Sequence, residues 1–287
     1  MRARYRWEFA LVGIAAVWGA TFPMVQDAVE RLPPFAFLAA RFALAAAVLA
    51  ALGAFRGLTA RELRAGAVIG GALTAGYAFQ TVGLQYTSAS NAGFITGMFV
   101  VFTPLIGAAV FRALPSRAAL TGVTLATAGL VLLAMPAGFR LGKGDALEVA
   151  TAFAFGLHIV LIALFARGSS ALRITGVQVA VTAVATGAVG ALAERSAAFD
   201  ADASVVLTVV VTAIGATVVG FWVQVRAQQD LPPVRTGVIL SAEPAFAGLF
   251  GYLLAGDRIG GRGIAGAALI LVGILVVSAL GPDRERL

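Results

Sequence analysis

The sequence predicts an all-α integral membrane protein with ten transmembrane helices, arranged as two inverted five-helix repeats. Three observations lead to this fold class. Of the 287 residues 60% are apolar and only 12% are charged, about half the charged share of a soluble domain. Apolar runs long enough to cross a bilayer recur ten times along the chain. The glycine and glutamine pattern of the first half also returns 144 positions later.

The internal repeat is clearest between Gly71 and Pro104. A shift of 144 positions places glycine on glycine and glutamine on glutamine more often than composition alone would. The coincident pairs are Gly71/Gly215, Gly76/Gly220, Gly93/Gly237, Gly107/Gly251, Gln80/Gln224, Gln85/Gln229, Gly122/Gly266 and Gly129/Gly273. We therefore predict a first five-helix repeat at 1–137, a connecting segment at 138–145 and a second, inverted repeat at 146–287.

The apolar runs define the spans in order. The first run follows Arg2, Arg4 and Arg6 and could pass for a signal peptide, but no small-residue cleavage site follows it. We expect it to be retained as a span, because nine more come after it. The expected spans are 8–25, 35–55, 63–84, 91–111, 118–135, 146–165, 174–193, 204–225, 237–254 and 264–280. Pro104 and Pro244 are expected to break corresponding spans of the two halves.

Basic residues predict the orientation, because positively charged loops stay in the cytoplasm. With the N-terminus inside, 14 basic residues fall on the cytoplasmic side and six on the outer side. We therefore expect cytoplasmic N- and C-termini. The excess of arginine, alanine and glycine suggests a GC-rich bacterial genome, so the bacterial inner membrane is the expected location. Basic residues are scattered singly between spans, which argues against nucleic-acid binding.

Five spans per half is an odd number, so the second copy must enter the membrane upside down relative to the first. Inverted repeats are the usual architecture of secondary transporters, with a solute site near mid-membrane where the repeats meet. The organisation therefore predicts a solute path between the two halves.

Polar groups deep in a span usually face a cavity or a partner, because they are costly in lipid. Glu243, followed by Pro244, could carry a proton or meet a cationic substrate; the alternative is a carboxyl pinned to an arginine or to backbone. Arg41 could recognise a substrate carboxylate, or tie a helix end structurally. His158, the only histidine, could relay protons or serve as a packing residue.

Amide and aromatic groups occupy matching depths in the third and eighth expected spans, and such groups suit an organic solute. The alternative for them is hydrogen bonding between helices. Trp18 lies deep in the first span, as a cavity wall or a packing wedge, and Asn91 at the entry to the fourth span is a ligand or a cap. The predicted substrate-binding residues are Trp18, Arg41, Tyr77, Gln80, Asn91, His158, Trp222, Gln224 and Glu243.

Several chemistries are absent from the sequence. There is no cysteine and only one histidine, so neither a thiolate nucleophile nor a metal motif can be built. No phosphate-binding loop of the type GxxxxGK[ST] is present, and Gly261-x-Gly263-x-x-Gly266 precedes a span rather than following a strand. We therefore expect no enzyme activity, no cofactor and no metal.

Five short motifs stand out in the chain: Trp18-Gly19-Ala20-Thr21-Phe22, Phe37-Leu38-Ala39-Ala40-Arg41-Phe42, the run from Gly83 to Ile95, Ser241-Ala242-Glu243-Pro244 and Gly256-Asp257-Arg258. Together they resemble the EamA family of the drug/metabolite transporter superfamily. The resemblance implies a ten-helix inner-membrane carrier, often an exporter of amino acids or related metabolites, and assigns Trp18, Arg41, Asn91, Glu243 and Pro244 to family motif positions. The first half lacks the acidic residue that often follows its fourth span, having Phe111-Arg112-Ala113-Leu114 instead.

The sequence thus predicts a secondary transporter that exports amino acids or similar small metabolites by alternating access. The substrate gradient, or protons carried by Glu243 or His158, would drive it. A first alternative is an exporter of cationic drugs or quaternary ammonium compounds, with Glu243, Trp18 and Trp222 as the recognition groups. A second alternative is a membrane scaffold subunit, which would have packed spans and no cavity.

Overall fold

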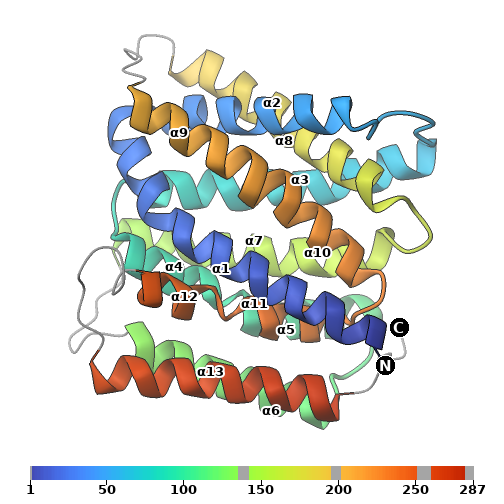
Figure 1. Ribbon diagram of the computed structural model, residues 1–287, viewed down its shortest axis with the longest axis vertical. Coiled ribbons are helices and arrows are strands. Elements are labelled where there is room, and N and C mark those ends of the chain that lie inside the picture. The colour runs from blue at the N-terminus through green and yellow to red at the C-terminus, as the bar shows by residue number, and fades with distance from the viewer. Residues whose placement is uncertain (1, 135–141, 195–201, 251–259, 282–287) are drawn as a thin grey trace.

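The computed structural model describes residues 2–134, 142–194, 202–250 and 260–281. Within these ranges the chain is helical apart from short turns and contains no strand. The helices lie side by side in one bundle, and most of them run across the molecule in similar directions (Figure 1). The all-α class predicted from the sequence is confirmed.

The helices differ from the expected spans mainly at their ends. The first helix begins at Arg2 and ends at Arg31, longer at both ends than expected. The bounds are α1 (Arg2–Arg31), α2 (Pro34–Ala51), α3 (Ala60–Gly83), α4 (Ala89–Gly97), α5 (Phe99–Phe111), α6 (Arg117–Ala134), α7 (Lys143–Phe165), α8 (Ala171–Ala193), α9 (Ala203–Val211), η1 (Thr212–Val219), α10 (Gly220–Gln228), α11 (Pro233–Leu240), α12 (Glu243–Phe250) and α13 (Gly261–Leu280). Residues 138–141 of the expected connecting segment and the motif Gly256-Asp257-Arg258 lie outside the described residues.

Seven of the described helical stretches are long and apolar enough to cross a membrane. They are Tyr5–Arg31, Pro34–Ala51, Asn91–Phe111, Lys143–Phe165, Ala171–Ala193, Ala203–Gln228 and Gly261–Leu280. A further apolar stretch, Arg117–Leu132, is shorter. Helix α3 has 24 residues, but its glycines and Gln80 lower its hydropathy. The chain is a multi-pass membrane protein, while the count of ten spans stays a prediction.

Side-chain caps explain where several helices begin. The side chains of Ser88, Ser170 and Asp202 accept backbone hydrogen bonds from the first turns of α4, α8 and α9, which satisfies donors that the helix itself cannot pair. Pro34 and Pro233 occupy the first turns of α2 and α11, where a missing N–H costs nothing.

Two breaks interrupt the fourth and ninth expected spans at equivalent places. One lies at Met98, between α4 and α5, and the other at Ser241 and Ala242, between α11 and α12. Position 98 corresponds to 242 in the register of 144. The expectation that Pro104 breaks its span was wrong, because Pro104 lies inside the continuous helix α5. Pro244 occupies the first turn of α12, just after its break.

The eighth span contains a segment of π-helix that the sequence did not predict. Residues Thr212–Val219 form η1, between α9 and α10. Within it the Thr217 hydroxyl donates to the carbonyl oxygen of Thr212, five residues earlier (2.9 Å). A π segment places one extra residue in a turn and is frequent at functional sites.

Glycines allow the last helices of the two halves, α6 and α13, to pack closely, and the two lie together at one side of the bundle (Figure 1). Gly122 of α6 lies against Gly273 of α13, and Gly129 lies against Gly266. A methyl group on Gly129 would come within 2.5 Å of the Gly266 carbonyl oxygen. The contact is antiparallel, and each half contributes the same two positions, since 122 and 129 correspond to 266 and 273.

Two further glycine contacts bring α1 and α7 against the broken spans. Gly19 of α1 lies against Phe246 of α12, and Gly156 of α7 lies against Phe102 of α5. The phenylalanines are 144 positions apart and the glycines 137 apart. The first helices of the two halves are therefore equivalent in a register of 137, which the sequence analysis missed.

The start of α1 and the end of α13 lie at the same end of the bundle, where buried Arg235 joins them. One terminal nitrogen of Arg235 donates to the carbonyl oxygens of Val277 and Gly281, both at 2.7 Å. The other lies 3.5 Å from the carboxylate of Glu8. Three helices, α1, α11 and α13, are thus held together at this end.

Candidate functional site

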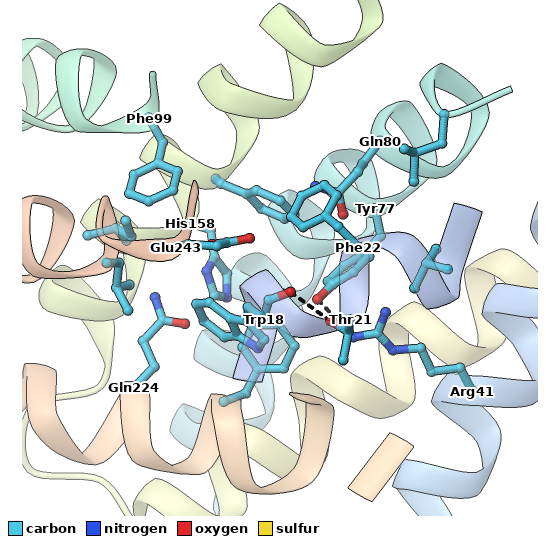
Figure 2. Close-up of a pocket in the computed structure, with 16 residues that line it drawn as sticks. Trp18, Thr21, Phe22, Arg41, Tyr77, Gln80, Phe99, His158, Gln224 and Glu243 are labelled. Carbon is cyan, nitrogen blue, oxygen red and sulfur yellow. Dashed lines mark hydrogen bonds between the residues drawn. The ribbon is translucent and has the colours of Figure 1, made fainter. Parts of the chain in front are cut away.

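A cavity lies between α1, α2, α3, α7, α10 and α12 (Figure 2). Its empty space is about 610 Å³, a volume that includes space open to the outside. The lining combines aromatic rings with a few polar groups. The lining residues are Trp18, Thr21, Phe22, Val25, Arg41, Tyr77, Gln80, Leu84, Phe99, Phe155, His158, Ile159, Phe221, Gln224, Leu240 and Glu243.

Seven of the nine predicted site residues meet in this cavity: Trp18, Arg41, Tyr77, Gln80, His158, Gln224 and Glu243. The other two lie elsewhere. Trp222 is 38% exposed and stacks edge-on against Trp7, with the ring centroids 6.2 Å apart. Asn91 lies in the first turn of α4, where its backbone N–H donates to the Ser88 hydroxyl at 3.2 Å.

Arg41 enters the cavity from α2 and is held by neutral oxygens. Its side chain is buried, with 3% of its surface exposed. Nε donates to the Thr217 hydroxyl at 2.9 Å, and Nη2 donates to the Tyr77 hydroxyl at 3.0 Å. Thr217 belongs to the π-helix η1. Its guanidinium also lies over the Tyr77 ring, 4.7 Å from the centroid. Arg41 forms no ion pair with any residue that the structure describes, so its described partners are all uncharged.

Glu243 begins α12, directly after the helix break, and only 7% of its surface is exposed. Its carboxylate faces the middle of the cavity, beside Trp18 (Figure 2). Within the described part of the chain it neither accepts a hydrogen bond nor pairs with a cation. The alternative of a carboxyl pinned to an arginine or to backbone is therefore not seen in this arrangement.

The remaining polar groups of the cavity are fixed by neighbours outside it. His158 Nε2 lies 2.8 Å from Oε1 of Gln178 on α8. Gln80 Nε2 donates to the Thr96 hydroxyl at 3.3 Å. Gln224 Nε2 donates to Oε1 of another glutamine one turn later, at 3.2 Å. The Gln224 Oε1 atom is buried and has no hydrogen-bond partner among the described residues.

Aromatic rings form much of the wall. Trp18 Nε1 donates to the Ala216 carbonyl oxygen of η1 at 2.9 Å, which fixes the plane of the indole. The Tyr77 ring packs edge-on against Phe155 and Phe221, at centroid distances of 5.4 and 6.1 Å. Phe221 also contacts Trp18, at 5.6 Å. A linked set of rings of this kind is rigid and suits an organic solute.

The lining residues come in pairs at equivalent positions of the two halves. The register of 144 relates Tyr77 to Phe221, Gln80 to Gln224 and Phe99 to Glu243. The register of 137 relates Trp18 to Phe155, Thr21 to His158 and Phe22 to Ile159. It also relates Arg41 to Gln178. The charged members are thus opposed by uncharged counterparts, so the paired positions are chemically unequal.

Several lining residues and one buried acid were not predicted from the sequence. Phe99 could have been found as the counterpart of Glu243 in the register of 144. Phe155 could have been found as the counterpart of Trp18 only with the register of 137. The missed acid is Glu148 of α7, which is fully buried outside the lining. It lies close to the start of its expected span, so its depth was not apparent from the sequence.

Comparisons with known proteins agree with these features. The model of the EamA-like transporter family matches residues 5–135 and 142–279. A protein of Archaeoglobus fulgidus described as an uncharacterized transporter is 33% identical over 271 residues, covering 94% of this chain and 85% of that protein. A second protein of the same organism, with the same description, is 30% identical over 155 residues, covering 50% of this chain and 53% of that protein.

A solved crystal structure shares the fold, with a TM-score of 0.78 and 22% identity over 94% of this chain and 96% of the other. The family resemblance of the sequence motifs is thus confirmed over nearly the whole chain. The chain belongs to the EamA-like transporter family and is a multi-pass membrane transporter.

Proposed function

We propose that this protein is a secondary transporter that exports amino acids or related zwitterionic metabolites. One observation carries the proposal: Arg41 and Glu243 line the same cavity, and neither has a partner of opposite charge among the described residues. Two buried charges without partners are costly. A substrate that brings one charge of each sign would compensate both.

The binding mode follows from the chemistry of the two groups. The guanidinium of Arg41 receives the substrate carboxylate through charge-assisted hydrogen bonds, since its present partners are the neutral hydroxyls of Thr217 and Tyr77. The carboxylate of Glu243 receives the ammonium group. The aromatic wall formed by Trp18, Tyr77 and Phe221 receives the side chain of the substrate.

Ten spans in two inverted repeats, at the domain bounds expected from the sequence, form the second part of the proposal. The family model matches each half of the chain. The contact between α6 and α13 is antiparallel and uses the same positions from both halves. The chain also enters α1 and leaves α13 at one end of the bundle, which requires an even number of crossings. These three observations support a pseudo-two-fold axis through the cavity.

Alternating access is supported by the unequal extent of the cavity toward its two ends. Val25 of α1 lines the cavity, whereas its counterpart Ile162 of α7 is fully buried in another cluster of apolar side chains. Leu84 also lines it, whereas its counterpart Gln228 is buried and donates to a backbone carbonyl of α7. If Ile162 and Gln228 came to line the cavity while Val25 and Leu84 became buried, the cavity would open toward the other end. The distribution of basic residues supports cytoplasmic termini. The excess of arginine, alanine and glycine supports a location in the bacterial inner membrane.

A second candidate, export of cationic aromatic compounds, is favoured by the rings that surround Glu243. A cation could lie against Trp18 and the carboxylate at once. Arg41 argues against it, because a like charge in the same cavity raises the cost of binding a cation. A scaffold subunit is less well supported, since it was expected to have no cavity between its helices.

The test pairs each charge of the protein with a charge of the substrate. In proteoliposomes, counterflow of amino acids is measured against analogues that lack one charge, namely amino-acid amides and N-acetyl amino acids. Loss of one charged hydrogen bond costs about 1.5–3 kcal/mol, or roughly 10- to 100-fold in affinity. Arg41→Gln should therefore weaken amino acids by this factor but leave the amides unchanged. Glu243→Gln should also weaken amino acids by this factor, but it should leave the N-acetyl compounds unchanged, because they lack the ammonium group.

Glu30→Gln is the control, because Glu30 is exposed at the end of α1, away from the cavity. If both variants weaken all three compound classes equally, the assignment of carboxylate and ammonium is wrong. If methyl viologen competes with amino acids and Arg41→Gln increases its affinity, one cavity serves both classes. Absence of saturable counterflow for every amino acid would contradict the proposed substrate class.

A further inference from the structure

Helix α7 carries a second deeply buried acid, Glu148, which the proposed substrate site does not use. It lies one turn after Asp145, near the end of the bundle opposite to the chain termini. None of its surface is exposed, and it is not part of the cavity lining. A buried ionisable group within a membrane span is usually functional.

Only one oxygen of the Glu148 carboxyl has a hydrogen-bond partner. Oε2 accepts from the Thr96 hydroxyl of α4 at 2.9 Å. Oε1 is buried and has no partner among the described residues. It lies beside Gly83 of α3, where an added methyl group would come within 2.7 Å of it. The acid is thus enclosed between α3, α4 and α7 with an unused oxygen.

Among the described residues, no cation compensates the Glu148 carboxyl. Its one titratable neighbour is Asp145, whose carboxylate already accepts from the Thr87 hydroxyl at 2.7 Å and from a backbone N–H at 2.9 Å. Lys143 lies over the ring of Tyr86, 3.9 Å from its centroid. Among the helices packed against α7, α4 and α5 contain no charged residue.

The charged residues of α3 lie in its first turns, at the far end of the helix from Gly83: Arg61, Glu62 and Arg64. Those of α10 and α11, Arg226 and Arg235, lie toward the end of the bundle that holds the chain termini. Tyr77 of α3, the remaining titratable group, is bonded to Arg41 in the cavity. An ionised carboxylate enclosed in this way, without a cation, costs several kcal/mol. Unlike Glu243, Glu148 lies outside the cavity lining, where neither cavity water nor a substrate ammonium group can reach it, so it holds a proton in this arrangement.

A short path of hydrogen bonds joins Glu148 to the cavity. Thr96 donates to Glu148, and its oxygen accepts from Gln80 Nε2 at 3.3 Å. Gln80 lines the cavity. The Glu148 carboxyl is thus linked through Thr96 to an amide that lines the cavity.

On its other side Glu148 is separated from the end of the bundle by one tight contact. Gly144 of α7 lies against α3 and the turn that follows it, where an added methyl group would be 2.9 Å from the Gly83 carbonyl oxygen and 2.8 Å from the Tyr86 carbonyl carbon. Helix α7 begins at Lys143, only five residues before Glu148. Separation of α3 from α7 at these two glycines would expose the acid to water.

We propose that Glu148 is the proton-binding site that couples transport to the pH gradient, exchanging its proton when α3 and α7 separate beside Gly83 and Gly144. A proton from water at that end of the bundle then forms the O–H bond on Oε1. When the cavity opens toward the other end, that bond breaks and the proton passes to water in the cavity, on the side that Thr96 and Gln80 connect to Glu148. The inference rests on the proposed function in taking solute transport as the coupled process.

The experiment compares Glu148→Gln with the exposed control Glu30→Gln in proteoliposomes. Glutamine mimics the protonated acid and cannot release a proton. Counterflow of amino acid at equal pH should persist in Glu148→Gln, whereas the ratio of flux with and without a pH gradient should fall to unity. Glu30→Gln should keep the wild-type ratio. Stimulation by pH that survives in Glu148→Gln, or a dependence on a sodium gradient instead, would overturn the proposal.

Two substitutions of Thr96 distinguish a role of Glu148 in proton coupling from a purely structural role. Thr96→Val removes the hydroxyl at nearly constant volume, and Thr96→Ser retains it. The valine variant should lose pH stimulation while the serine variant keeps it. Equal behaviour of the two variants would remove Thr96 from the coupling path.

A spectroscopic measurement separates failure of this inference from failure of the proposed function, because it needs no substrate. Infrared difference spectra between neutral and alkaline pH should show loss of a buried carboxylic-acid band in the wild type and in Glu30→Gln, but not in Glu148→Gln. If no such band is missing from Glu148→Gln, Glu148 does not carry the proton. If the band is present but no amino acid is transported, the substrate class alone is wrong.

Discussion

Residues at equivalent positions of the two halves differ in charge at and near the cavity. Phe99 and Glu243 occupy corresponding positions beside the cavity, as do Arg41 and Gln178 on the equivalent helices α2 and α8. A strictly symmetric lining would present either two acids or none. The inequality gives the cavity one positive and one negative pole, which a zwitterion can match.

Depth within a span predicted most of the candidate site, but not the direction of each side chain. Phe221 faces the cavity, whereas the adjacent Trp222 is turned about 100° around the helix and packs on Trp7. Depth alone cannot distinguish neighbours of this kind. Glu148 was missed for the opposite reason, because tight packing at Gly83 and Gly144 buries a residue near a helix end.

Glu62, ahead of the expected span at the start of α3, provides a prediction about pH. Burial raises the pKa of its carboxyl, but hydrogen bonds from the backbone of Ser170 and from Thr59, with further help from Arg173, lower it to about 2 from the ordinary 4.5. The folded protein thus favours the ionised form. Its stabilising contribution is complete above pH 4.5 and is lost as the pH falls toward 2.

Thermal unfolding of the detergent-solubilised protein checks this prediction. The difference in Tm between wild type and Glu62→Gln should shrink as the pH is lowered through that window, whereas the exposed control Glu30→Gln should track the wild type. A difference that is constant with pH would mean that the charge of Glu62 does not contribute to stability.

At the scale of elements, the sequence predicted the positions of the spans better than their internal breaks. Pro104 was expected to open its helix, but α5 continues through it, and the break occurs at Met98. The position equivalent to Met98 is Ala242, at the break before Glu243. Nothing in the local sequence around Met98 marks a helix end, and the π-helix η1 likewise has no local signal. Both depend on packing against the opposite half.

The close contact of α1 with α12 gives a prediction at this scale. A methyl group on Gly19 would lie 2.5 Å from the Glu243 carbonyl oxygen and 2.8 Å from the Ala247 backbone nitrogen, neither of which can move independently of its helix. Gly19→Ala should therefore displace the start of α12 and cost about 1–3 kcal/mol. Transport should fall as well, since Glu243 moves with that turn.

Gly13, six residues earlier on the same helix, is the matched control. An added methyl group there has no atom within 4 Å, so Gly13→Ala should leave transport unchanged and keep or slightly raise Tm, because alanine favours the helix by about 1 kcal/mol. Equal loss of Tm in both variants would show that the contact between α1 and α12 is not the cause.

At the scale of the whole molecule, the cavity reaches further toward one end than toward the other. Arg235 joins α1, α11 and α13 at the end that holds both chain termini. At the same end Gln229 donates to the carbonyl oxygens of Ala166 and Ser169, beyond the last turn of α7. These contacts hold the helices together at that end, whereas Val25 and Leu84 line the part of the cavity toward the opposite end.

The register of 144 could be recognised in the sequence because glycines that lie at helix contacts recur in it. The second register, of 137 positions, could not be recognised in the same way, because it relates residues of different type, such as Trp18 and Phe155. Only their contacts reveal the equivalence: Trp18 packs on Gly220, and Phe155 packs on Gly76.

The absence of cysteine from the chain allows the most direct test of alternating access between the two halves. Single cysteines at the equivalent positions, Val25→Cys and Ile162→Cys, are treated with a membrane-impermeant thiol reagent from each side of the vesicle, with and without saturating amino acid. We expect Val25→Cys to react from the side opposite to the start of α1 while Ile162→Cys is protected, and we expect substrate to change the two rates in opposite directions. Rates that rise or fall together, or an Ile162→Cys that never reacts while transport continues, would contradict alternating access.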